Sequence, residues 1–288
     1  MLFLDINRIL LVCSALFPAI ALAIYVYKKD RAEKEPIELL LCLFFFGISS
    51  CFPAMHLETA LLTVIDSSFG VTAQSLVFPN LKTYLLYEFF TNFVGIALVE
   101  EGLKWLFLFF FTRKNKNFNS LFDGVIYAVF VSLGFAAYEN VLYVLKYGFQ
   151  TAIARAVMSV PGHMFFGVIM GYYYTVWNVY EKARKQELGL IKAGVIKPDK
   201  NLFSGNKLLL ASVLVPVFIH GLYDFCCSVQ VLYGNVALII LICFLYCYCF
   251  YEIKDLSRRD RSDISVSYKL VINKYPGAAD YIRDNARK

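Results

Sequence analysis

The sequence predicts an all-α membrane protein, a polytopic bundle of about seven transmembrane helices. Hydrophobic residues make up 59% of its 288 residues, whereas soluble domains contain about 45–50%. The mean hydropathy of +0.59 agrees with this composition. Most apolar residues fall in runs of about 20, long enough to cross the hydrocarbon of a bilayer as helices. Helical bundles and closed barrels are the two spanning structures, and these runs are too long for barrel strands.

Charged connectors divide the chain into its predicted helices. Pro36 suits the first turn of the second helix because that position needs no N–H donor. Residues 56–83 are mixed in character and are predicted to form an external loop with an interfacial segment, and residues 181–206 are predicted to form a polar connector. The predicted spans are 9–27, 37–55, 84–112, 121–145, 153–180 (or from Pro161), 207–228 and 231–251.

The distribution of Lys and Arg predicts the orientation in the membrane. One set of flanks carries 23 of the 28 basic residues, and the opposite set carries 4. Cytoplasmic flanks are enriched in Lys and Arg, so the N-terminus is predicted to lie outside and the C-terminus in the cytoplasm. The net charge of +6 is therefore explained by the basic flanks of the membrane helices, and we expect no nucleic-acid partner.

The chain is predicted to divide into a transmembrane domain, residues 1–256, and a charged cytoplasmic tail, residues 257–288. Arg258, Arg259 and Arg261 are grouped at the start of that tail, and attraction to anionic lipid explains such a group. The eight cysteines form no CxxC pair and nearly all lie in apolar runs. They are interpreted as small hydrophobic residues rather than as disulfides or metal ligands.

Ionisable residues inside the third predicted helix are the main anomaly of the sequence. Glu100, Glu101 and Lys104 interrupt a run that is otherwise apolar from 93 to 112. Each such residue near the bilayer centre costs roughly 2.5–3.5 kcal/mol on insertion scales, so it usually has a function. Glu100 and Lys104 share a helix face at i,i+4, which favours an ion pair, whereas Glu101 is expected to diverge from Glu100 by about 100°.

Three later helices carry ionisable residues at a similar predicted depth. His220 and Asp224 share a face at i,i+4, which lets the carboxylate fix the imidazole. Asp123, Lys146 and Arg155 lie near helix ends, where snorkelling of the side chain explains them. The candidate site is therefore Glu100, Glu101, Lys104, Glu139, His163, His220 and Asp224, in the outer to middle layer of the membrane.

This set of residues is compatible with two forms of hydrolysis inside a membrane. Histidines and carboxylates can hold a divalent metal such as zinc, with a spare carboxylate as base toward a bound water. The same groups without metal can activate water by general base catalysis. A proton- or cation-coupled transporter is the alternative function, because buried Glu, His and Asp also relay protons. A non-catalytic sensor or scaffold is a third possible function. Taken one at a time, the ionisable residues are also explained by structural ion pairs or interhelical hydrogen bonds.

Five motifs together resemble the PrsW family of intramembrane proteases, which is more distantly similar to the CAAX endopeptidase superfamily. They are Glu100-Glu101-x-x-Lys104, Phe122-Asp123-Gly124-x-x-Tyr127, Gly134-Phe135 with Glu139-Asn140, His163-x-x-Phe166-Gly167 and His220-x-x-x-Asp224. The resemblance covers residues 1–255. It implies a multi-pass enzyme of the bacterial cell membrane that cleaves a single-pass substrate, an anti-sigma factor, in site-1 fashion near the outer side.

The resemblance and the residue pattern together assign expected roles. Glu100 and Glu101 are expected to hold and deprotonate the attacking water, and Lys104 to keep one of them ionised. Metal binding or polarisation of the scissile carbonyl is the role expected of Glu139, His163 and His220. Asp224 is expected to orient the imidazole of His220. The superfamily has His at the position of Glu139 and Asn at that of Asp224, so both the metal-bound and the metal-free glutamate mechanisms stay open.

Overall fold

The computed structural model confirms an all-α fold. It describes residues 6–30, 33–72, 77–199, 201–229 and 232–285, and within these ranges the only β pairing is an isolated bridge between Ser120 and Ser262. The elements are α1 (Ile6–Lys29), α2 (Ile37–Phe69), α3 (Leu81–Phe89), the π-helix η1 (Phe90–Ala97), α4 (Leu98–Thr112), α5 (Asp123–Tyr147), α6 (Phe149–Val157), α7 (Ser159–Lys192), α8 (Asn206–Ser228), α9 (Leu232–Arg259), α10 (Asp263–Lys274), the 3₁₀ turn η2 (Pro276–Ala278) and α11 (Ala279–Asn285).

Six helices in the described part of the chain are long and apolar enough to cross a membrane. They are α1, α2, α5, α8, most of α9, and the stretch formed by α6 and α7. The remaining predicted span, 84–112, lies within α3, η1 and α4, which follow one another without a break. The membrane-embedded bundle is thus confirmed, and its third predicted helix is divided by a π-helical segment that ends directly before α4, whose first turn carries the acidic pair.

The prediction of an external loop from residue 56 is wrong for its first part. Helix α2 continues from Ile37 to Phe69 and ends at Gly70, which adopts a left-handed conformation with φ of 69°. Pro53 lies inside this helix without ending it. No further proline follows until Pro79, and glycine at a helix C-terminus accommodates positive φ without steric cost. The extra turns place Glu58 on a membrane helix.

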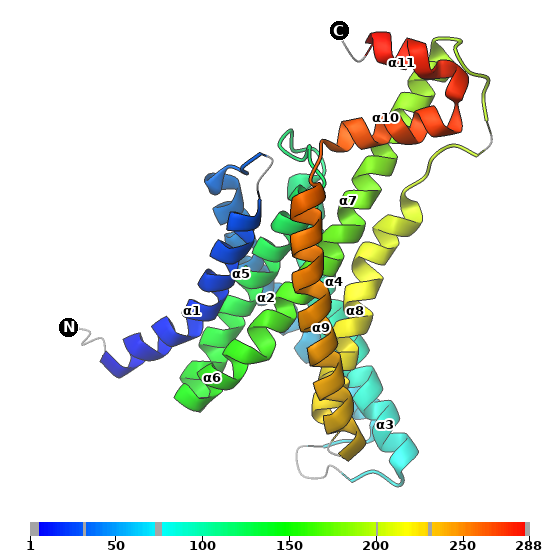
Figure 1. Ribbon diagram of the computed structural model, residues 1–288. Helices are drawn as coiled ribbons and strands as arrows, with labels where there is room; N and C mark the ends of the chain where they lie inside the picture. The colour runs from blue at the N-terminus through cyan, green and yellow to red at the C-terminus, as the bar shows by residue number, and fades with distance from the viewer. Residues whose placement is uncertain (1–5, 31–32, 73–76, 200, 230–231, 286–288) are drawn as a thin grey trace.

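The fifth predicted helix is also different from its expected form. It is divided into α6 and α7, which follow Gly148, a residue with φ of 88°. Helix α7 then continues to Lys192, through the first part of the segment predicted to be a polar connector. In Figure 1 the far end of α7 rises above the bundle, with α10 and α11 beside it.

The tail folds onto this extension of α7. Lys182 forms an ion pair with Asp263, and Glu187 accepts a hydrogen bond from Lys274 at 2.6 Å. Ala183 and Leu190 of α7 pack with apolar residues of α10, η2 and α11 in a small separate core. The segment predicted as a charged tail therefore contains helices that pack against the membrane domain.

Helix α5 lies at the centre of the bundle and packs against α1, α2 and α7. Its approach to α2 requires glycine on both sides. A Cβ atom on Gly134 would lie 2.0 Å from the backbone oxygen of Phe44, and one on Gly47 would lie 2.0 Å from that of Val131. The two backbones are therefore in direct contact, as small residues allow between membrane helices.

The motif that begins at Phe122 stabilises the end of the bundle away from the acidic pair. Asp123 is fully buried and accepts hydrogen bonds from the backbone N–H groups of Asn119 and Ser120, so snorkelling does not describe it. Tyr127 donates a hydrogen bond of 2.6 Å to Glu35 in the connector between α1 and α2. Glu35 is buried, and burial raises the pKa of its carboxyl group to about 8.

Candidate active site

The polar site begins in the first turns of α4. Lys104 is fully buried, and its Nζ atom lies 3.0 Å from Oε2 of Glu100 and 2.7 Å from Oε1 of Glu101. The expected i,i+4 pair is present. The expected divergence of the two carboxylates is not, because the long lysine side chain reaches both residues at i−4 and i−3. One ammonium group thus contacts both carboxylates and offsets one of their two negative charges.

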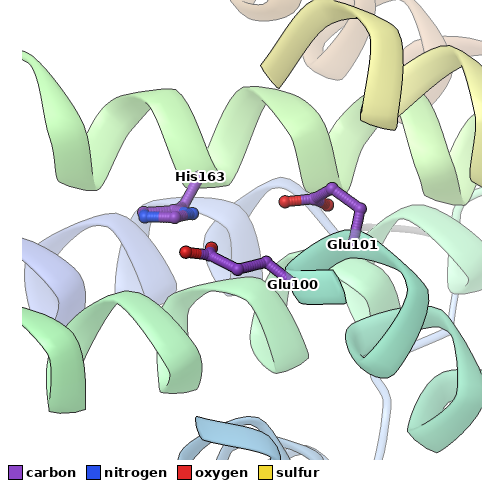
Figure 2. Close-up of side chains that lie close together, drawn as sticks. All are labelled: Glu100, Glu101 and His163. Atoms are coloured by element: carbon purple, nitrogen blue, oxygen red, sulfur yellow. The ribbon is translucent and has the colours of Figure 1, made fainter. Parts of the chain in front are cut away.

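His163 of α7 links this group to α5. Its Nδ1 atom lies 3.1 Å from Nζ of Lys104, and its Nε2 atom lies 2.9 Å from Oε2 of Glu139. Lysine can only donate, so Nδ1 accepts and Nε2 carries the proton that is donated to Glu139. Figure 2 shows the imidazole close to both carboxylates of α4. All three N–H bonds of Lys104 therefore have an acceptor.

His220 of α8 lies on the other side of Glu101. Its Nδ1 atom is 2.9 Å from Oε1 of Glu101, and its Nε2 atom is 3.2 Å from Oδ2 of Asp224. Nδ1 forms a hydrogen bond with Glu101 and Nε2 lies at ion-pair distance from Asp224, so each ring nitrogen faces a carboxylate, an arrangement suited to the doubly protonated ring. Phe166 stacks on the ring with 4.6 Å between centroids. The expected orientation of His220 by Asp224 is therefore present.

A cavity of about 640 Å³ gives access to this network. It is lined by parts of α2, η1, α4, α5, α6, α7 and α8. Five of the predicted site residues face it, namely Glu100, Glu139, His163, His220 and Asp224. Glu101 and Lys104 are fully buried behind them. The cavity lies toward the ends of α2, α5 and α8, the side that the charge distribution predicts to be extracytoplasmic.

All seven predicted site residues thus belong to one continuous network across α4, α5, α7 and α8. Two charged residues that the sequence did not assign to the site also line the cavity. Arg155 of α6 contacts Glu139 with 2.7 Å between Nη2 and Oε2, so snorkelling does not explain it. Glu58 was missed because its segment was predicted to be a loop. No spacing rule in the sequence relates either residue to the motifs of α4, α7 or α8.

Three residues of the site offer ligand atoms that could hold a divalent metal once His163 is released from its present partners. One ligand atom from each of Glu100, Glu101 and His163 lies within 4.8 Å of the others, and two carboxylates with an imidazole are ligands that zinc accepts. Oε2 of Glu101 is buried and has no hydrogen-bond partner. Glu100, Glu101 and His163 form the one group of potential metal ligands found among the described residues. This group shares only His163 with the predicted set of Glu139, His163 and His220, and that set stays a prediction.

Lys104 restricts when His163 could join a metal. An imidazole nitrogen has a single lone pair, and that of Nδ1 faces the ammonium of Lys104. The other nitrogen faces Glu139. Coordination by His163 would therefore require the side chain of Lys104 or of Glu139 to move away.

Comparisons with known proteins agree with the geometry. Residues 35–250 match the family described as PrsW family intramembrane metalloprotease. A Protease PrsW of Geobacillus kaustophilus (strain HTA426) is 34% identical over 214 residues, covering 74% of this chain and 78% of the relative. The Protease PrsW of Shouchella clausii (strain KSM-K16) is 33% identical over 250 residues, covering 86% of this chain and 97% of the relative. That of Bacillus subtilis (strain 168) is 32% identical over 215 residues, covering 75% of this chain and 81% of the relative. No solved structure matches this chain.

Proposed function

This chain belongs to the PrsW family of membrane-embedded proteases, and we propose that it hydrolyses a peptide bond of a single-pass membrane protein near the extracytoplasmic side of the bilayer. The observation that carries this proposal is the cavity onto which Glu100, His163 and His220 converge. Such a cavity can admit water and an unwound peptide segment into a layer where hydrocarbon would otherwise exclude both.

Glu100 is the residue that we assign as the general base. It lines the cavity, whereas Glu101 is fully buried and already accepts hydrogen bonds from Lys104 and His220. In this mechanism a water molecule beside Glu100 gives its proton to the carboxylate and attacks the scissile carbonyl. The proton then passes to the leaving amine. During both proton transfers, to Glu100 and from Glu100 to the amine, the opposite charges of Lys104 and Glu101 stay beside the Glu100 carboxylate.

His220 is the donor that we assign to the developing oxyanion. Its Nε2 atom faces the cavity side of the network, where Asp224 is its present partner. A substrate carbonyl oxygen could accept from the same N–H, and a positioned cationic donor stabilises the negative charge of the tetrahedral state. Asp224 would then hold the ring in place at the start of the reaction.

A metal, if bound, would be held by Glu100, Glu101 and His163. It would supply Lewis acidity and a more acidic bound water. In that case Glu100 would share the activation of water with the metal, and the N–H of His220 would add to the stabilisation of the substrate oxygen.

The substrate that we propose is a membrane-anchored anti-sigma factor, cut in the first step of regulated proteolysis. The motif resemblance supports this choice, together with the position of the cavity at the predicted outer side. A substrate of this kind has one transmembrane segment and an external domain, which would bring the outer end of that segment to the cavity mouth.

The proposed function can be tested with a single-pass reporter substrate that carries a tag at each end. The variant His220→Ala is expected to reduce cleavage by at least about 100-fold, because a lost oxyanion donor typically costs 10²–10³ in rate. His56→Ala is the matched control, since His56 is exposed on α2, does not line the cavity and forms a hydrogen bond with the backbone oxygen of Phe52 in its own helix. Wild-type cleavage by a correctly inserted His220→Ala protein would refute the proposal.

Metal content separates the two possible ligand sets. If Glu100, Glu101 and His163 are the ligands, zinc bound to purified protein is expected to fall to background in His163→Ala and to persist in His220→Ala. Elemental analysis of both variants beside wild type measures this directly. Loss of zinc in His220→Ala and Glu139→Ala instead would support the set predicted from the sequence.

A further inference from the structure

Arg155 occupies an unusual place for a basic residue at the membrane surface. It lies on the short helix α6, whose apolar residues Phe149, Ile153 and Val157 recur every four positions and are 57–60% exposed. That stripe is suited to lipid, so α6 has an apolar face toward the membrane. The side chain of Arg155 is only 14% exposed and extends into the cavity instead.

Three contacts fix the guanidinium group of Arg155. Its Nε atom donates to Oδ1 of Asn140 at 2.9 Å, and the group lies 4.2 Å from the ring centre of Tyr143. Asn140 is itself fully buried and donates to the backbone oxygen of Ala15 on α1. The remaining charged contact, 2.7 Å from Nη2 to Glu139, therefore comes from a group whose position is already determined.

Glu139 connects Arg155 to His163 through one carboxylate oxygen. The same oxygen, Oε2, accepts from Arg155 at 2.7 Å and from Nε2 of His163 at 2.9 Å. The side chain of Glu139 is 21% exposed on the cavity wall and could adopt other rotamers, and an arginine contact with fixed geometry selects one of them. With the proton of His163 held on Nε2, its Nδ1 lone pair faces the group formed by Lys104, Glu100 and Glu101.

We propose that Arg155 is a positioning residue of the protease, which holds Glu139 against His163 and thereby sets the tautomer and orientation of that imidazole. This inference rests on the proposed function. It assigns to α6 a role beyond connecting α5 to α7, because this helix carries the residue that contacts Glu139 at the cavity wall.

If Arg155 acts on catalysis through Glu139 and does not contact substrate, its replacement should lower kcat and leave KM nearly unchanged. The variant Arg155→Gln is expected to lower kcat by about 10–100-fold, the range typical of residues that orient a functional histidine. KM for the reporter substrate should change by less than about 2-fold, because the residue does not contact substrate in this account. Arg155→Lys keeps one charged donor and should recover part of the lost kcat.

A double-mutant cycle with Glu139→Gln tests the route of the effect. If Arg155 acts through Glu139, adding Arg155→Gln to Glu139→Gln should lower kcat by less than about 2-fold further, since the two residues form one unit. An equal fold loss in both backgrounds would overturn the proposal, as would a rise in KM at unchanged kcat, which would place Arg155 in substrate binding.

Lys146→Gln is the matched control for this experiment. Lys146 is also a basic residue near the end of α5, but it is exposed and stacks on Tyr147 rather than contacting Glu139. Wild type and Lys146→Gln should cleave equally, which shows that the protease function itself stands. Thermal unfolding of each variant in micelles confirms that kcat is compared among folded proteins, and Arg155→Gln with wild-type kcat would refute the inference.

Discussion

Replacing Glu100 with glutamine is expected to lower cleavage of a membrane substrate by about 10²–10⁴-fold, the usual contribution of a general base. Glutamine keeps the shape of the side chain and an oxygen that accepts from Lys104, so insertion and folding should persist. It cannot take a proton from water at neutral pH. Single-turnover cleavage by purified protein in proteoliposomes measures the effect.

Glu38→Gln provides the control for this substitution. Glu38 is an exposed carboxylate in the first turn of α2, at the end of that helix remote from the cavity. The control should cleave at the wild-type rate. If Glu100→Gln retained more than about a tenth of the wild-type rate, Glu100 would not be the base, and the equivalent change at Glu101 would become the next test.

The variant Lys104→Met is expected to destabilise the fold as well as abolish cleavage. Loss of the ammonium group leaves the carboxylates of Glu101 and Glu100, both buried, without their shared cation. It also removes the hydrogen-bond donor to His163. Removing one partner of a buried ion pair typically costs about 3–5 kcal/mol. Thermal unfolding in micelles should therefore begin well below the wild-type temperature.

A second substitution distinguishes uncompensated charge from lost packing. Adding Glu101→Gln to Lys104→Met removes one of the orphaned charges and should restore part of the unfolding temperature. It should not restore cleavage. Lys146→Met, which removes an exposed lysine, should unfold as wild type does. An unchanged unfolding temperature in Lys104→Met would show that the network does not stabilise the bundle.

The sequence was sufficient for features that depend on one helix. The contacts of Lys104 with Glu100 and of His220 with Asp224 follow from i,i+4 spacing, and the existence of the membrane helices, though not all of their ends, follows from apolar runs. The meeting of all four helices at a common depth was predicted by counting residues from helix ends. That count succeeded because helices of fixed rise connect two parallel membrane surfaces.

Features that depend on packing between helices could not be predicted in the same way. The hydrogen bond from His220 to Glu101 and the contact of Arg155 with Glu139 depend on how α8 and α6 are rotated. Glu58 was missed for a different reason, because nothing between Pro53 and Gly70 marks clearly where α2 ends. The folded tail was missed since its contacts with α7 combine a small apolar core with single polar pairs, such as Lys182 with Asp263, that no spacing in the sequence reveals.

Cleavage of a purified single-pass substrate in H₂¹⁸O, followed by mass spectrometry of both fragments, tests the central claim most directly. We predict one cut in the outer part of the transmembrane segment or its outer flank, with one ¹⁸O atom in the new carboxylate. The product should be absent with Glu100→Gln. A cut on the cytoplasmic side, or the same fragments from wild type and Glu100→Gln, would contradict a water-activating site built on this network.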